Sequence, residues 1–185
     1  MKIYVLLAPG FETIEALAPV DIFKRAKLDV TTVSIAPTRE VTSSHGVTVT
    51  ADTVLDSEAS LADADLIVLP GGYPGYENLC ADSRVVAISR RQWESGRLLA
   101  AICGAPTVLA AGGIAPGASV TCHHSVAEKM KAAGYNVTGE RISVDHNLVT
   151  AAGAGLSVHF ALSLAAMLTN DKTLTEHLFD ALELK

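Results

Sequence analysis

The hydrophobic residues of this chain fall into short continuous runs separated by segments with helical spacing. Continuous apolar runs are typical of parallel strands that are covered on both faces. Such runs occupy residues 2–8, 30–35, 65–69 and 98–102. Apolar residues spaced three or four positions apart predict amphipathic helices. That spacing is found in residues 13–26, 83–94, 125–133, 156–168 and 173–182. Pro19 falls inside the first of these helices and is expected to kink or limit it.

The remaining segments predict smaller elements. Valine alternates with threonine near residues 41–51, which predicts exposed strands joined by turns. Residues 55–64 predict a short helix, and residues 119–122 a short strand. Residues 141–145 and 148–151 predict a hairpin, with the intervening pair of residues at its turn.

Strands that alternate with helices predict right-handed crossovers and a mostly parallel sheet. We therefore expect an α/β fold, a three-layer sandwich of the flavodoxin-like kind with helices on both faces, in one domain over residues 1–185. Ligands of such folds bind beyond the carboxyl ends of the strands. The loops after Ala8, Leu69 and Ile102 are expected to meet at that edge.

Composition narrows the classes of function. The net charge of the 185 residues is −6, so no basic face for nucleic acid is expected, and the scattered Lys and Arg residues predict no membrane surface. Residues 98–120 and 151–168 approach the length of a membrane span, but glycine interrupts both and proline also breaks the first. Three cysteines do not make a disulfide framework, and the short apolar start does not fit a signal peptide. A cytoplasmic protein in a reducing compartment is the expectation.

Cys103 lies where the predicted strand 98–102 turns into a helix. Gly104 and Ala105 leave room for a tight turn, and Pro106 is well tolerated at a helix start. The arrangement is similar to the nucleophile elbow of hydrolases, with sulfur in place of oxygen. Because a helix N-terminus favours a thiolate, we expect the pKa of Cys103 to lie below the ~8.5 of a free cysteine. The alternative is a small, inert core residue.

Five segments, in family order and spanning nearly the whole chain, resemble the ThiJ/PfpI (DJ-one-like) superfamily. They are residues 10–16 (GFETIEA) with 19–21 (PVD), residues 68–72 (VLPGG), residues 101–107 (AICGAPT), residues 120–123 (VTCH), and residues 153–155 (GAG) leading to 160–162 (FAL). The resemblance implies a homodimer that needs no cofactor.

The resemblance also implies roles for other residues. Glu15 matches the glutamate that hydrogen-bonds the reactive sulfur and would exchange protons with a substrate; its ordinary place would be a helix surface. His123 matches an auxiliary histidine of the site, with a structural histidine as the alternative. The N–H groups of Gly72 and Gly104 would face the cysteine and bind an oxyanion, unless both glycines only serve their turns.

No metal site is expected around the adjacent residues Cys122, His123 and His124. On a strand only Cys122 and His124 would share a face, and the sequence offers no third or fourth ligand at a familiar spacing. Cys80 matches nothing catalytic in the superfamily, and we read it, like Cys122, as non-catalytic.

The chain also departs from its superfamily. Peptidase members carry a histidine directly after the cysteine, where this chain has Gly104. The two arginines that flank the pocket in many DJ-one-like relatives are replaced by His45 and Ala152. The sequence therefore argues against a protease and leaves an anion-binding corner of the pocket without its usual residues.

Three functions are compatible with these residues. The first is a glyoxalase or deglycase that acts on small reactive dicarbonyls or early glycation adducts through Cys103, without metal or glutathione. The second is a redox-sensing stress regulator or chaperone that uses the same thiolate. The third, a glutamine amidotransferase-like or peptidase hydrolase, ranks last, because the late pair Glu176 and His177 would point apart on a helix.

Overall fold

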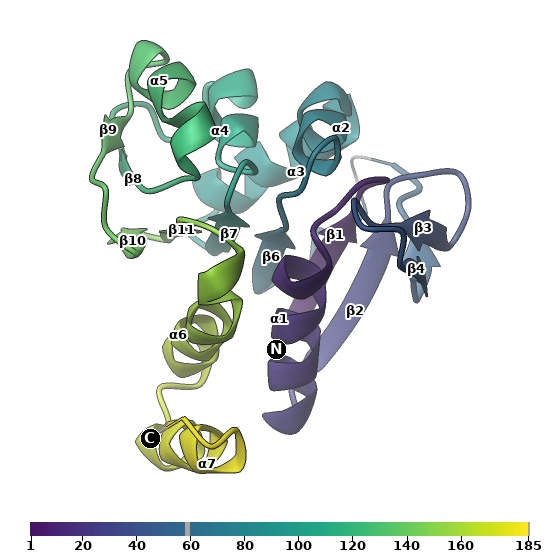
Figure 1. Cartoon of the computed structure of the whole chain (residues 1–185), viewed down its shortest axis with the longest axis vertical. Coiled ribbons are helices and arrows are strands. Elements are labelled where there is room, and N and C mark those ends of the chain that lie inside the picture. The colour runs from purple at the N-terminus through teal and green to yellow at the C-terminus, as the bar shows by residue number, and fades with distance from the viewer. Residues whose placement is uncertain (58–59, 185) are drawn as a thin grey trace.

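The computed structural model describes residues 1–57 and 60–184 and has a central sheet between two layers of helices (Figure 1). The sheet strands are β1 (Lys2–Leu7), β2 (Asp29–Ser34), β5 (Thr53–Val54), β6 (Leu66–Leu69), β7 (Leu98–Ile102), β10 (Ile142–Asp145) and β11 (Leu148–Ala151). Their spatial order is β10-β11-β7-β6-β1-β2-β5, and every pair is parallel except β10 with β11. The predicted α/β sandwich with a mostly parallel sheet is confirmed.

Helices cover both faces of this sheet. One face carries α1 (Thr13–Arg25) and α6 (Ser157–Thr169), with the 3₁₀ turn η1 (Ala154–Leu156) before α6 and α7 (Lys172–Ala181) against its far end. The other face carries α2 (Gly75–Ala81), α3 (Ser83–Glu94), α4 (Thr107–Gly112) and α5 (His124–Ala132). Two small sheets flank the domain: β3 (Glu40–Thr42) pairs with β4 (Thr48–Thr50), and β8 (Ser119–Val120) with β9 (Asn136–Val137).

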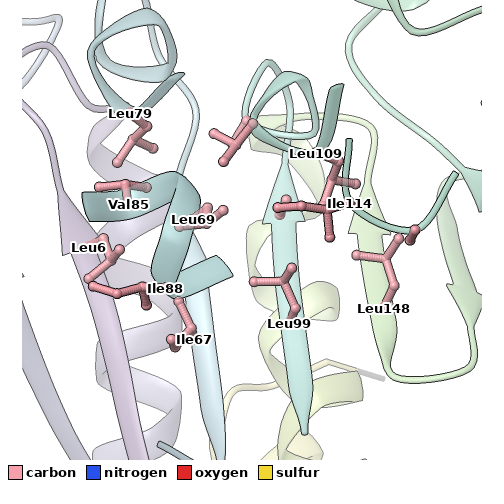
Figure 2. Packing of buried hydrophobic residues seen from close by; sticks show 14 of the residues in the cluster. Leu6, Ile67, Leu69, Leu79, Val85, Ile88, Leu99, Leu109, Ile114 and Leu148 are labelled. Atoms are coloured by element: carbon pink, nitrogen blue, oxygen red, sulfur yellow. The ribbon is translucent and has the colours of Figure 1, made fainter. Parts of the chain in front are cut away.

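The strand pattern builds two cores. Ile3, Val5 and Leu7 of β1 pack in the cluster under α1 and α6, whereas Leu6 packs in the cluster under α2 to α5. Figure 2 shows this second cluster, in which Leu6 lies beside Ile88 of α3 and Ile67 of β6, and Leu99 of β7 continues the cluster beyond β6. Fully burying one such side chain contributes about 1.5–3 kcal/mol. Continuous apolar strands therefore fix both the sheet and the helix layers.

Several local predictions need correction. The described part of residues 55–64 forms turns instead of a helix; Ser57 N–H donates to Ser60 Oγ (3.2 Å), the kind of local bond that competes with helix, and residues 58–59 lie outside the described residues. Pro19 does not end α1, which runs through it to Arg25. The elements α2, β5 and β9 were not predicted.

The apolar stretches that approach the length of a membrane span resolve into strand and helix. Residues 98–120 contain β7, α4 and β8, and residues 151–168 contain the end of β11, η1 and most of α6. Over the described residues, none of the helices combines the length and the apolar character needed to cross a bilayer.

Candidate active site

Cys103 stands at a strained turn directly after β7. Its φ is +64°, a left-handed conformation that costs a non-glycine residue of the order of 1–3 kcal/mol. Two hydrogen bonds hold this conformation: the Cys103 N–H donates to Ala151 O (2.9 Å), and the Cys103 carbonyl accepts from His123 N–H (2.8 Å). The strand-to-helix elbow predicted from the sequence is present. Hydrogen bonds to β11 and to the segment before α5 hold it in place.

Glu15 is completely buried in the first turn of α1, so the surface position is excluded. Its Oε2 accepts a hydrogen bond from Gly71 N–H (2.8 Å). A Cβ on Gly71 would lie 2.7 Å from both Cys103 Cβ and Glu15 Oε2, which explains why the chain has glycine there. Gly71 thus lets the carboxyl and the thiol approach each other across the edge of the sheet.

The thiol and the carboxyl change each other's pKa. Burial raises the pKa of Glu15 to about 7, although hydrogen bonds from Cys103 and Gly71 lower it. Glu15 Oε1 is buried and has no well-formed hydrogen bond to any of the described residues. Burial, the charge of Glu15 and the hydrogen bond to Glu15 raise the pKa of Cys103 to about 12.

The expectation that the pKa of Cys103 lies below ~8.5 is therefore wrong. The helix α4 has only six residues and begins at Thr107, so its dipole is weak and distant. Burial and a neighbouring carboxylate outweigh it. When Glu15 holds the proton, however, both of its effects on the thiol disappear. After losing one proton, the pair of Cys103 and Glu15 shares the remaining proton and carries one negative charge. In one form the proton lies on Cys103, and in the other it lies on Glu15 and Cys103 is a thiolate.

The backbone amides of Gly72 and Gly104 lie near the sulfur and lower the pKa of Cys103. Each of these two amides belongs to a peptide unit whose carbonyl oxygen also accepts a hydrogen bond. The Gly71 carbonyl accepts from Glu12 N–H (2.9 Å), and the Cys103 carbonyl from His123 N–H (2.8 Å). Such chains polarise the N–H groups at their ends. That these two amides face the cysteine and bind an oxyanion stays a prediction.

His123 reaches the elbow through its main chain. The strand β8 ends at Val120, so the alternation assumed for residues 122–124 does not apply, and His123 is the N-cap of α5. Its Nδ1 lies 2.8 Å from Ser125 Oγ, and its ring lies 4.1 Å from the ring of His124. Burial and His124 lower the pKa of His123, which favours a neutral ring. A catalytic role for that ring stays a prediction.

A depression of about 620 Å³ opens beside His123. Its lining includes Cys122, Ala152 and Gly153, so one position that is often arginine in relatives lies here. The other, His45, is exposed in the turn between β3 and β4. Throughout residues 1–57 and 60–184, no three His, Cys, Asp or Glu side chains gather closely enough to hold a metal ion.

Sequence reasoning missed three residues of the site. Gly71 was given no role of its own within the VLPGG segment, although two consecutive glycines are a signal of close backbone approach. Thr107, which is buried and donates its hydroxyl to Gly104 O (2.6 Å), was likewise only quoted. Tyr76, whose ring lies on Gly104, belongs to the unpredicted helix α2 and gave no signal.

Comparisons with known proteins place the chain in a family and agree with its fold. A family model described as the DJ-1/PfpI family matches residues 1–167. The Parkinson disease protein 7 homolog of Danio rerio is 37% identical over 161 residues, covering 86% of this chain and 85% of its own. The glutathione-independent glyoxalase DJR-1.2 of Caenorhabditis elegans is 32% identical over 165 residues, covering 89% and 87%. A crystal structure of a cysteine-to-alanine mutant of a DJ-1 superfamily protein from Salmonella typhimurium has a TM-score of 0.91 at 34% identity, covering 98% and 97%.

Proposed function

Because the chain belongs to the DJ-1/PfpI family, we propose that it is a cysteine-dependent glyoxalase that converts small dicarbonyls to 2-hydroxy acids without glutathione. The observation that carries the proposal is the pairing of the half-buried Cys103 with the fully buried Glu15, with the amides of Gly72 and Gly104 near the sulfur. The glyoxalase named among the relatives supports the same activity. Early glycation adducts of the same aldehydes are the alternative substrates. That the protein forms a homodimer remains a separate prediction.

The chemistry uses the proton that the pair shares. With the proton on Glu15, the Cys103 thiolate adds to the aldehyde carbon of methylglyoxal, and the carbonyl oxygen takes the proton to give a hemithioacetal. The Glu15 carboxylate then removes the hydrogen on that carbon and returns a proton to the neighbouring carbon, which leaves a thioester next to a secondary alcohol. Water cleaves the thioester to lactate and restores the thiol. The amides of Gly72 and Gly104 stabilise the oxyanions along this path.

The test is direct. Purified protein is incubated with methylglyoxal in the absence of glutathione and added metal, and lactate is measured enzymatically together with the loss of dicarbonyl. We expect lactate to form in proportion to the dicarbonyl consumed. Consumption of dicarbonyl without lactate would indicate adduct formation on surface side chains and would refute the glyoxalase proposal.

Redox sensing is a second candidate, since the same arrangement suits oxidation. Peroxide transfers one oxygen to a thiolate and leaves as water, and a second peroxide gives the sulfinate. The amides of Gly72 and Gly104 and a protonated Glu15 are the donors that sulfinate oxygens need. One related solved structure, the DJ-1 of Toxoplasma gondii, is described as oxidized.

Graded peroxide is expected to modify Cys103 before Cys80 or Cys122 and to stop at the sulfinate. Burial raises the pKa of all three thiols, but among the three Cys103 is the one whose pKa two backbone amides lower. Peptide mass mapping after each peroxide dose gives the order. Equal oxidation of the three cysteines would mean that Cys103 is not specially activated, and the sensor candidate would be abandoned.

A further inference from the structure

The short helix α2 packs against the elbow that carries Cys103. It is anchored in the core by Leu79, which is 1% exposed and lies with Leu69 and Val85 in the cluster shown in Figure 2. Two residues of the same helix lie one turn apart and face this region: Tyr76 contacts Gly104, and Cys80 contacts Thr107 at the start of α4. An anchored helix can hold a strained turn in place, because its own position is fixed independently of the turn.

The first contact is the ring of Tyr76 on Gly104. A Cβ built on Gly104 would lie 2.4 Å from Tyr76 Cδ1 and 2.7 Å from its Cγ, far inside the closest approach of real side chains. Gly104 is not among the glycines with positive φ, so its backbone conformation does not itself require glycine. The tyrosine ring therefore accounts for the glycine at position 104.

The second contact runs from Cys80 to Thr107. The Thr107 hydroxyl donates its single hydrogen to Gly104 O (2.6 Å), and Cys80 Sγ lies 3.2 Å from the same hydroxyl oxygen. Because that hydrogen is already used, Cys80 must be the donor in this second bond. The chain from Cys80 through Thr107 thus holds the carbonyl of Gly104, while Tyr76 covers its Cα.

We propose that Tyr76 is a positioning residue, whose ring fixes Gly104 and thereby keeps the Gly104 N–H beside the Cys103 sulfur. A hydrogen bond to a thiolate depends on both distance and direction, so a small rotation of the Cys103–Gly104 peptide weakens it. Tyr76 acts on the thiolate only through this peptide. Residues 76 and 104 are consequently coupled: a ring at position 76 requires glycine at 104, and a small residue at 76 leaves room for a methyl group.

The test follows the reactivity of Cys103 towards iodoacetamide as a function of pH, with mass mapping of the peptide that contains Cys103. Misalignment of the Gly104 N–H weakens its interaction with the thiolate without removing it, so Tyr76→Ala should slow alkylation at neutral pH about three- to tenfold. Tyr76→Phe keeps the ring and should react like the parent. Tyr73→Ala is the matched control, since Tyr73 is 68% exposed and contacts the ring of Tyr76.

A rescue experiment separates positioning from general destabilisation. Gly104→Ala alone should slow alkylation more than Tyr76→Ala does, and adding Tyr76→Ala to it should restore much of the lost rate, because the colliding ring is gone. Circular dichroism establishes that each variant is folded, and Tyr76→Leu replaces Tyr76→Ala in both arms if the alanine variant unfolds. Unchanged alkylation in the folded Tyr76 variant, or no rescue of Gly104→Ala, would overturn the proposal. Alkylation uses no dicarbonyl, so the result stands whether or not the protein forms lactate.

Discussion

Replacing Cys103 by serine is expected to remove lactate formation from methylglyoxal while the protein stays folded. A serine hydroxyl has a far higher pKa than a thiol, and Glu15, with a pKa of about 7, is too weak a base to ionise it. We expect turnover to fall by roughly three orders of magnitude or more, as it does when a nucleophile is removed. Lactate production and circular dichroism of the parent and the variant measure the two halves of this prediction.

The other two cysteines provide the controls. Cys80→Ser keeps a donor for the Thr107 hydroxyl, and Cys122 lies in the depression beside His123 rather than at the elbow, so Cys122→Ser changes nothing at the sulfur. Both variants should keep most of the parent turnover. A Cys103→Ser variant that still forms lactate would refute the nucleophile assignment, and the same loss in either control would refute the division among the cysteines.

The sequence was most informative where one residue pattern has one physical meaning. The continuous apolar runs of β1, β6 and β7 can be buried on both faces only in a covered parallel sheet, and the predicted bounds of β7 match the structure. The elbow could be predicted for the same reason, since a strand, a cysteine, small residues and a proline leave few backbone paths. Short elements such as α2 have too few residues for a helical period to emerge, and their place is set by packing.

The electrostatics of the site could not be predicted from the chain alone. The helix dipole was the only influence on Cys103 that its neighbours in sequence suggested, and it pointed in the wrong direction. The decisive influences come from burial and from Glu15, which is 88 positions away in the chain. Glu15 meets Cys103 only because β1 and β7 lie on either side of β6, so that the segments following them come together at the carboxyl ends of the strands. For the same reason, the link between the main chain of His123 and Cys103 was invisible in the sequence.

The position of the C-terminal helix bears on the amidotransferase-like alternative. The helix α7, which carries Glu176 and His177, packs against the end of α6 that is remote from the carboxyl ends of the strands (Figure 1). A triad completed by that pair would require them at the elbow of Cys103. The fold thus adds a spatial argument to the sequence argument against an amidotransferase-like hydrolase.

The pH dependence of turnover should report the shared proton. Below pH 7 both Glu15 and Cys103 hold their protons, and the neutral pair has no thiolate. As the pH rises through about 7, the pair loses one proton, and the form with the thiolate and a protonated Glu15 becomes accessible. Turnover and alkylation of Cys103 should both rise through this pH and then level off, because the second proton leaves only near pH 12.

Glu15→Gln is expected to abolish turnover while it makes Cys103 a stronger acid. Glutamine cannot move a proton between the two substrate carbons, and losing a general base costs roughly 10²–10⁴-fold in rate. The negative charge of Glu15 raises the thiol pKa, so its removal should bring the pKa of Cys103 below the parent value of about 12, and the step near pH 7 should vanish from the alkylation profile.

Glu15→Leu removes the donor as well and should leave the thiol pKa above that of the glutamine variant. Peroxide should still oxidise Cys103 in Glu15→Gln, because the amides of Gly72 and Gly104 remain. An alkylation profile that keeps its step near pH 7 without Glu15 would show that another group holds the proton, and the proposed shuttle would be wrong.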